Sequence, residues 1–171
     1  MSRCLTRFML WVARLTLERL GKTAENTTDS RLLDLLADVQ DYAILTPGVL
    51  NAVLLNRATN PQTLCRLLDD EALWGGEEEA RVHVVYNPAL PLERLTEVMR
   101  RDESEYVRVA AACALAERLS NDCTTDPQIT AECRGFLTEI DTRTDEYDDV
   151  KVSLQLLQAI GSRPRTGDGV E

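Results

Sequence analysis

The chain has 171 residues, of which 44% are hydrophobic and 28% charged, as expected for one globular domain. Its 29 acidic side chains outnumber 19 basic ones, and the resulting charge of −10 argues against nucleic-acid binding through a general basic surface. No apolar run approaches the roughly 20 residues that a membrane-spanning helix needs.

Residues 1–22 are predicted to form a terminal helix that differs in charge from the rest of the chain. Segment 1–25 holds five basic and two acidic side chains and is rich in apolar residues, whereas the remainder is strongly acidic. Three interpretations stay open: a cap on the first repeat, a helix that docks on a partner or membrane surface, and a cleaved organellar targeting segment. Gly21 follows an apolar run and predicts the end of this helix.

Prolines mark where later helices begin and end. In Thr46-Pro47, Asn60-Pro61 and Asp126-Pro127, a residue that can cap a helix precedes a proline, which is favoured at the first helical position. Asn87-Pro88 predicts a helix end instead, because the residue before proline avoids the α conformation. Apolar residues recur at helical spacing between these marks, so we expect eight or nine helices joined by short loops.

The helices repeat along the sequence. A shift of 31 residues places 55–60 (LNRATN) on 86–91 (YNPALP), and a shift of 43 places 107–109 (VRV) on 150–152 (VKV). A period of about 30 to 45 residues containing two helices is typical of an α-solenoid, in which stacked helix pairs bury a continuous core.

These repeats predict an all-α fold, namely a short right-handed α-solenoid of stacked helix pairs. We expect a single domain over 1–161, with the repeats in 29–160, and a disordered tail at 162–171.

Part of the sequence resembles known repeat families. Residues 84–95 (VVYNPALPLERL), then Asp102 and 107–111 (VRVAA), resemble a leucine-rich repeat variant unit, and the starts at 105–108 and 148–151 resemble the second helix of HEAT repeats. The resemblance implies a HEAT-like α-solenoid. Some leucine-rich repeat variant proteins bind an iron–sulfur cluster through a cysteine cluster, which this chain lacks. We expect Arg108 to reach an acidic neighbour between repeats or to contact a partner.

The inventory of reactive residues offers no recognisable catalytic or metal site. His83 is the only histidine, the five cysteines form no Cys-x-x-Cys pair, and no glycine-rich phosphate loop is present. We therefore predict a protein without cofactor, metal or catalytic residues. An enzyme on a HEAT-like scaffold remains an alternative, because some related solenoids act on modified nucleic-acid bases or tetrapyrroles.

Two acidic stretches could bind a partner. Residues 69–79 hold six acids, Trp74 and a glycine pair, and 141–149 hold five acids around Tyr147. Each also has a structural interpretation, as a solvated loop or as acids that favour a helix N-terminus. The residues chosen as candidate partner contacts are Trp74, Glu77, Glu78, Glu79, Tyr106 and Tyr147.

We accordingly expect a non-catalytic, cytoplasmic protein-interaction module whose acidic surface binds a basic protein or peptide. A small inhibitor of the immunity or antitoxin type is a specific alternative, and a subunit of a larger assembly is another.

Overall fold

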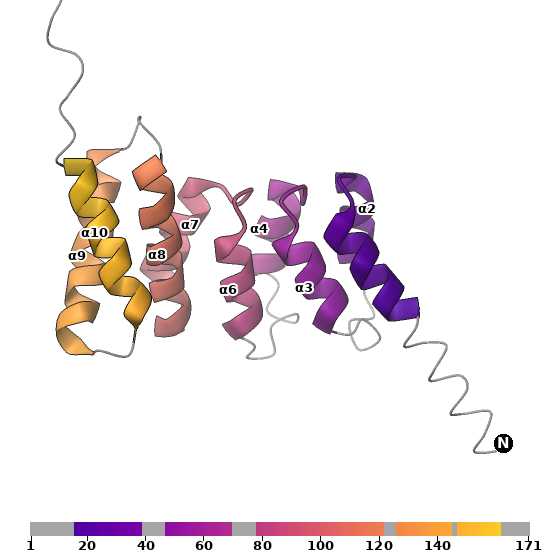
Figure 1. The fold of residues 1–171 in the computed structure, drawn as a ribbon, viewed down its shortest axis with the longest axis horizontal. Helices are drawn as coiled ribbons and strands as arrows, with labels where there is room; N and C mark the ends of the chain where they lie inside the picture. Colours follow the sequence, from indigo (N-terminus) through magenta and orange to yellow (C-terminus); the bar gives the residue numbers. More distant parts are fainter. Residues whose placement is uncertain (1–15, 39–46, 70–77, 122–125, 145–146, 162–171) are drawn as a thin grey trace, which may run out of the picture. The chain divides into compact units, whose positions relative to one another are not determined.

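The structure, a computed structural model, describes residues 16–38, 47–69, 78–121, 126–144 and 147–161 (Figure 1). These residues form nine helices and no strand, which confirms the all-α prediction. The chain divides into two compact units, Met1–Pro91 and Leu92–Glu171, and each is described by itself. Segment 1–15 and the tail 162–171, for which a helix and disorder were expected, lie outside the described residues.

The unit Met1–Pro91 is built from short helices, and the pairs that pack together include helices that are not adjacent in sequence. Its helices are 16–26, α2 (Ser30–Ala37), α3 (Pro47–Leu55), α4 (Pro61–Asp69) and α6 (Glu78–Tyr86). Helix α3 packs against α2 and α6, and α4 packs against the same two helices. Fully buried leucines such as Leu33, Leu54 and Leu64 fill the space between them.

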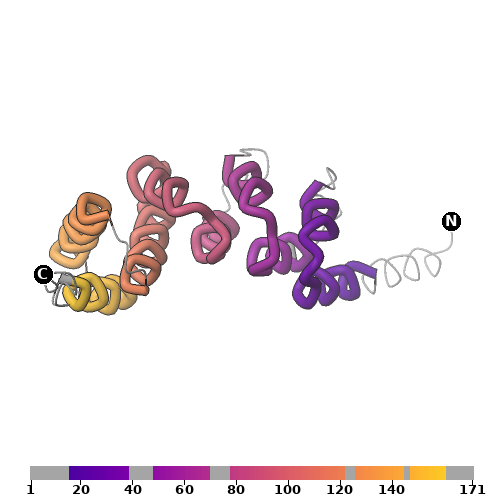
Figure 2. Tube along the Cα trace, turned by 90° about the horizontal axis from the view of Figure 1, so that it is seen from above, coloured from indigo at the N-terminus to yellow at the C-terminus, as the bar shows by residue number. Residues whose placement is uncertain are grey.

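The unit Leu92–Glu171 is organised around one central helix. It contains α7 (Leu92–Arg101), α8 (Glu105–Asn121), α9 (Pro127–Arg143) and α10 (Asp148–Gly161). Helix α8 packs against all three of the others, and α9 also packs against α10 (Figure 2). The central position of α8 explains its sequence, because alanines at 110–112, 114 and 116 are buried and their small side chains allow neighbouring helices to approach closely.

The predicted helix starts are confirmed where they can be observed. The side-chain oxygen of Asn60 accepts a hydrogen bond from the Gln62 amide at 3.0 Å, and that of Asp126 accepts one from the Gln128 amide at 2.8 Å. Proline follows each of these caps, where its missing N–H costs no helical hydrogen bond. Helix α3 likewise begins at a proline, although Thr46 before it lies outside the described residues.

Two asparagines at equivalent repeat positions join successive helix pairs. The side-chain amide of Asn87 donates to the carbonyls of Leu54 at 2.6 Å and Asn56 at 3.0 Å. The amide of Asn56 donates in turn to the carbonyls of Ala24 at 2.5 Å and Thr27 at 2.9 Å. The last carbonyls of a helix have no partner within that helix, so each asparagine caps the C-terminal end of a helix in the preceding pair. The shift of 31 residues thus reflects a shared structural role.

One helix boundary predicted from glycine is wrong. Gly21 was expected to end the first helix, but helix 16–26 continues through it and ends five residues later. A Cβ atom at Gly21 would lie 3.9 Å from the Gly48 carbonyl oxygen, an ordinary van der Waals distance, so the space here would also admit an alanine. A glycine after an apolar run can therefore lie inside a helix, at a modest cost in helix propensity, and need not be a C-cap.

Candidate functional site

The structure brings together two of the predicted contact residues, Tyr106 and Tyr147. Tyr106 lies in the first turn of α8, and Tyr147 immediately precedes α10. Their rings stack with centroids 6.5 Å apart and an interplanar angle of 24°. Packing of α10 on α8 places the N-terminal ends of both helices together, so residues 41 positions apart in the sequence meet.

The tyrosine pair is accessible from solvent. Tyr106 is 46% exposed, and Tyr147 is half-buried. The adjacent residues Val107 and Val150 are almost fully buried, so they anchor the first turns of α8 and α10 in the core. The stack therefore rests on a rigid base while part of its aromatic surface stays open for contact, which is the arrangement expected of an aromatic anchor.

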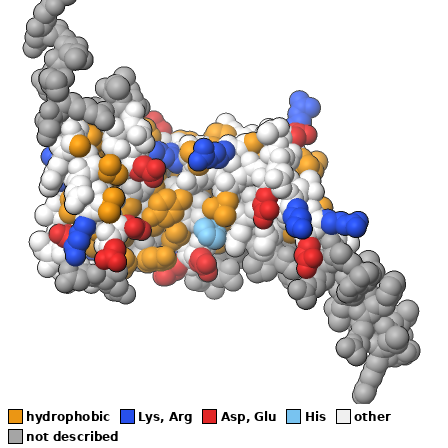
Figure 3. Space-filling view, in the orientation of Figure 1, with side chains coloured by type: hydrophobic (Ala, Val, Ile, Leu, Met, Phe, Trp, Pro, Cys, Tyr) orange, Lys and Arg blue, Asp and Glu red, His pale blue; other side chains and the backbone are white. Residues whose placement is uncertain are grey.

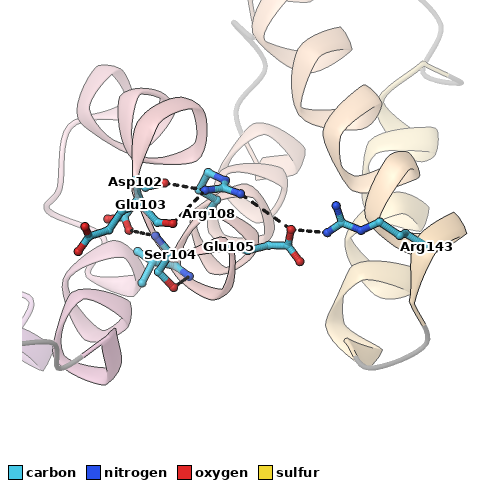
Figure 4. Close-up of polar contacts among 7 residues, drawn as sticks. Asp102, Glu103, Ser104, Glu105, Arg108 and Arg143 are labelled. Atoms are coloured by element: carbon cyan, nitrogen blue, oxygen red, sulfur yellow. Dashed lines mark hydrogen bonds and ion pairs between the residues drawn. The ribbon is translucent and has the colours of Figure 1, made fainter.

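An ion pair links the third helix of this unit to the same site. Arg143, the last residue of α9, donates a hydrogen bond from Nη2 to Oε2 of Glu105, the first residue of α8 (Figure 4). The hydrogen bond and the charge of Glu105 raise the pKa of Arg143, so its guanidinium remains charged. The C-terminal end of α9 also favours a cation electrostatically.

Arg108 organises the loop in front of α8. Its Nη1 donates to the carbonyl of Asp102 at 2.7 Å and to that of Glu103 at 3.4 Å, while its Nη2 lies 3.9 Å from Glu105 (Figure 4). Arg108 was expected to reach an acidic neighbour between repeats. The acid that it reaches belongs instead to its own helix, and its shortest hydrogen bond goes to a backbone carbonyl.

Exposed carboxylates border the two tyrosines in sequence. Glu103 lies in the loop before α8, and Asp148 and Asp149 form the first turn of α10; all three side chains are exposed. The N-terminal ends of helices favour such acids, which explains part of the pattern. On the face drawn in Figure 3, acidic, basic and hydrophobic side chains are interspersed over the surface formed by α8–α10. We call Glu103, Glu105, Tyr106, Tyr147, Asp148 and Asp149 the tyrosine patch.

The other predicted contact residues belong to the unit Met1–Pro91. Glu78 and Glu79 are exposed in the first turn of α6, whereas Trp74 and Glu77 lie outside the described residues. Sequence reasoning missed the link between Glu105 and Arg143. The only available signal was that each residue adjoins an acidic segment containing a tyrosine.

The described residues of the unit Leu92–Glu171 include two cysteines. Cys113 and Cys133 are buried in α8 and α9; burial raises the pKa of Cys113, and it raises that of Cys133 to about 12. Thiols with raised pKa values are poor nucleophiles at neutral pH. Across 16–38, 47–69, 78–121, 126–144 and 147–161, no three His, Cys, Asp or Glu side chains are grouped to hold a metal ion.

A depression of about 280 Å³ lies in the unit Met1–Pro91. It is lined by Glu25, Gly48, Asn51, Ala52, Leu55 and Asn56. Of these lining residues, Glu25 carries a titratable side chain.

No protein-family model, curated protein or solved structure matches the chain. None of the helices in the described part of the chain combines the length and apolar character that crossing a membrane requires.

Proposed function

We propose that this protein is a non-catalytic, cytoplasmic protein-interaction module that binds a basic protein or peptide through the tyrosine patch. The observation that carries the proposal is the stacked pair of Tyr106 and Tyr147, partly exposed and bordered by carboxylates. The sequence resemblance to HEAT-like and leucine-rich repeat variant proteins supports it, since helical repeats commonly serve as binding scaffolds.

The chemistry of the patch suits a cationic side chain. Lysine and arginine are attracted to the face of an aromatic ring, and nearby carboxylates strengthen this attraction. Aromatic anchors fixed on rigid elements also contribute much of the binding free energy in protein interfaces. A basic partner would therefore find both an aromatic contact surface and a complementary charge at one position.

The distribution of charge supports the choice of this unit. Leu92–Glu171 contains seventeen acidic and ten basic side chains, whereas Met1–Pro91 contains twelve and nine. The unit that carries the tyrosine patch thus holds most of the net negative charge. The electrostatic field of this negative charge attracts basic partners and speeds their encounter with the protein. Added salt screens the field and weakens the attraction.

Affinity capture from native cell extract tests the proposal. The full chain, a Tyr106→Ala variant and a Tyr86→Ala control are used as baits at low and high salt, with captured proteins identified by mass spectrometry. Tyr86 is a suitable control because it is 42% exposed, at the end of α6 in the other unit.

We expect a basic protein that is captured by the unmodified chain and by Tyr86→Ala, and that is lost with Tyr106→Ala and at high salt. Retention by Tyr106→Ala, with circular dichroism showing that all three baits are folded, would contradict the proposal. Capture of no protein that depends on Tyr106 would contradict it as well.

A further inference from the structure

We propose that the tyrosine patch recognises an arginine side chain of the partner, and that Arg143 occupies the place of this arginine in the unbound protein. The inference rests on the proposed function and makes it specific: the ligand group is a guanidinium, and binding requires Arg143 to leave Glu105.

The contacts of Arg143 show what the patch can hold. Its guanidinium donates to the carboxylate of Glu105, the residue that precedes Tyr106 in the first turn of α8. A planar guanidinium is thus already bound on a carboxylate of the patch. The protein's own side chain provides an example of the chemistry that fits there.

The contact is also easily exchanged. The side chain of Arg143 is 50% exposed and that of Glu105 is 37% exposed, so water reaches both ends of the pair. Exposed ion pairs of this kind contribute little to stability, because the charges are screened and the side chains lose conformational freedom. A partner's arginine can therefore replace Arg143 without breaking any part of the core.

The neighbouring Arg108 does not compete in the same way. Its guanidinium holds the carbonyls of Asp102 and Glu103, and it is only 26% exposed. Arg108 thus keeps the loop and the first turn of α8 in shape, while Arg143 is the cation that can move.

Arginine suits this position better than lysine. The guanidinium is planar, so it can stack on a tyrosine ring while it donates two parallel hydrogen bonds to a carboxylate. The lysine ammonium is a compact charge that cannot do both. The patch should therefore discriminate between two peptides of equal charge.

The unit contains a matched control for Arg143. Arg100 of α7 donates two hydrogen bonds to Glu132 of α9, from Nε at 2.6 Å and from Nη2 at 2.5 Å. This pair is similarly exposed, at 46% and 36%, and neither residue belongs to the tyrosine patch. Arg100→Gln and Arg143→Gln remove the same charge from the same unit, so any general effect of net charge must be equal in the two variants.

The test measures binding of fluorescein-labelled peptides by anisotropy. The probes are a short peptide of alternating arginine and glycine and the corresponding lysine peptide, each titrated with the full chain, Arg143→Gln and Arg100→Gln. We expect the full chain to bind the arginine peptide more tightly than the lysine peptide. We also expect Arg143→Gln to bind the arginine peptide about two- to fivefold more tightly than Arg100→Gln does. An exposed ion pair such as Arg143–Glu105 contributes a free energy that corresponds to about this factor, and Arg143→Gln removes its competition with the peptide.

The possible failures are distinguishable. Equal binding of both peptides, or equal affinities of Arg143→Gln and Arg100→Gln, would overturn the inference while leaving an acidic surface that binds cations. No binding of either peptide by the full chain would overturn the proposed function of the patch, and the inference with it. Thermal melts of both variants establish that they remain folded.

Discussion

Replacing Asn87 by alanine should destabilise the protein more than any comparable change at its surface. Asn87 is 1% exposed, and its side chain donates hydrogen bonds to the carbonyls of Leu54 and Asn56 and accepts one from the Ala89 amide at 2.9 Å. At about 1 kcal/mol net for each bond, the loss amounts to about 3 kcal/mol. The Leu54 carbonyl, near the end of α3, would lose its side-chain donor in a site that water does not reach.

Asn56 provides the internal comparison for this magnitude. Its side chain also donates two hydrogen bonds to carbonyls and accepts one, from the Ala58 amide at 2.8 Å, but Asn56 is only half-buried. In Asn56→Ala, water can form hydrogen bonds with some of the backbone groups that lose their bond to the Asn56 side chain. Asn56→Ala should therefore lower the free energy of unfolding by about 1–2 kcal/mol less than Asn87→Ala does.

Urea denaturation followed by circular dichroism measures both free energies of unfolding. Asn26→Ala serves as the surface control, since the exposed Asn26 side chain donates to the Lys22 carbonyl of its own helix. The reasoning would be refuted if Asn87→Ala cost less than 1 kcal/mol, or no more than Asn56→Ala. Either result would mean that the asparagines do not connect the helix pairs in the way the hydrogen bonds indicate.

Three further predictions concern the unit Leu92–Glu171. Burial raises the pKa of Cys133 from 9.0 to about 12. The protonated thiol therefore stabilises the folded protein fully below pH 9, and this contribution falls by up to about 1.4 kcal/mol per pH unit as the pH rises towards 12. Cys133→Ala should make the free energy of unfolding, measured by urea titration, less dependent on pH over this range. Asp126→Ala removes the cap of α9 and should cost about 1 kcal/mol in the same assay. Arg100 lowers the pKa of Glu132 through their hydrogen bonds; Arg100→Gln should raise that pKa in an NMR titration, and an unchanged value would show that the pair does not form in solution.

The local sequence predicted the helices well, because their start signals act over a few residues. Asn60-Pro61 and Asp126-Pro127 each cap a helix through one side-chain oxygen, and no distant residue is needed. The internal shift that aligned Asn56 with Asn87 also predicted a real equivalence, since both residues make the same set of hydrogen bonds. Gly21 misled because glycine is favoured just after helix ends but also occurs inside helices, where it costs about 1 kcal/mol relative to alanine.

The candidate site could be predicted only as separate residues. Tyr106 and Tyr147 were each singled out, yet their stacking depends on how α10 packs on α8, and no pattern within either segment encodes that contact. The pairing of Arg143 with Glu105 spans 38 residues and depends on where α9 ends. The handedness of the helical stack and a single domain over 1–161 remain predictions from the repeats.

NMR of the tyrosine rings tests the binding role of the tyrosine patch most directly. The chain has four tyrosines, so selective ¹³C labelling gives a small set of ring signals that can be assigned by single substitutions to phenylalanine. During titration with the arginine–glycine peptide, we expect the signals of Tyr106 and Tyr147 to shift together while that of Tyr86 stays in place, and high salt should abolish the shift. Unchanged signals of Tyr106 and Tyr147 at saturating peptide, or equal shifts of all four tyrosines, would contradict the account.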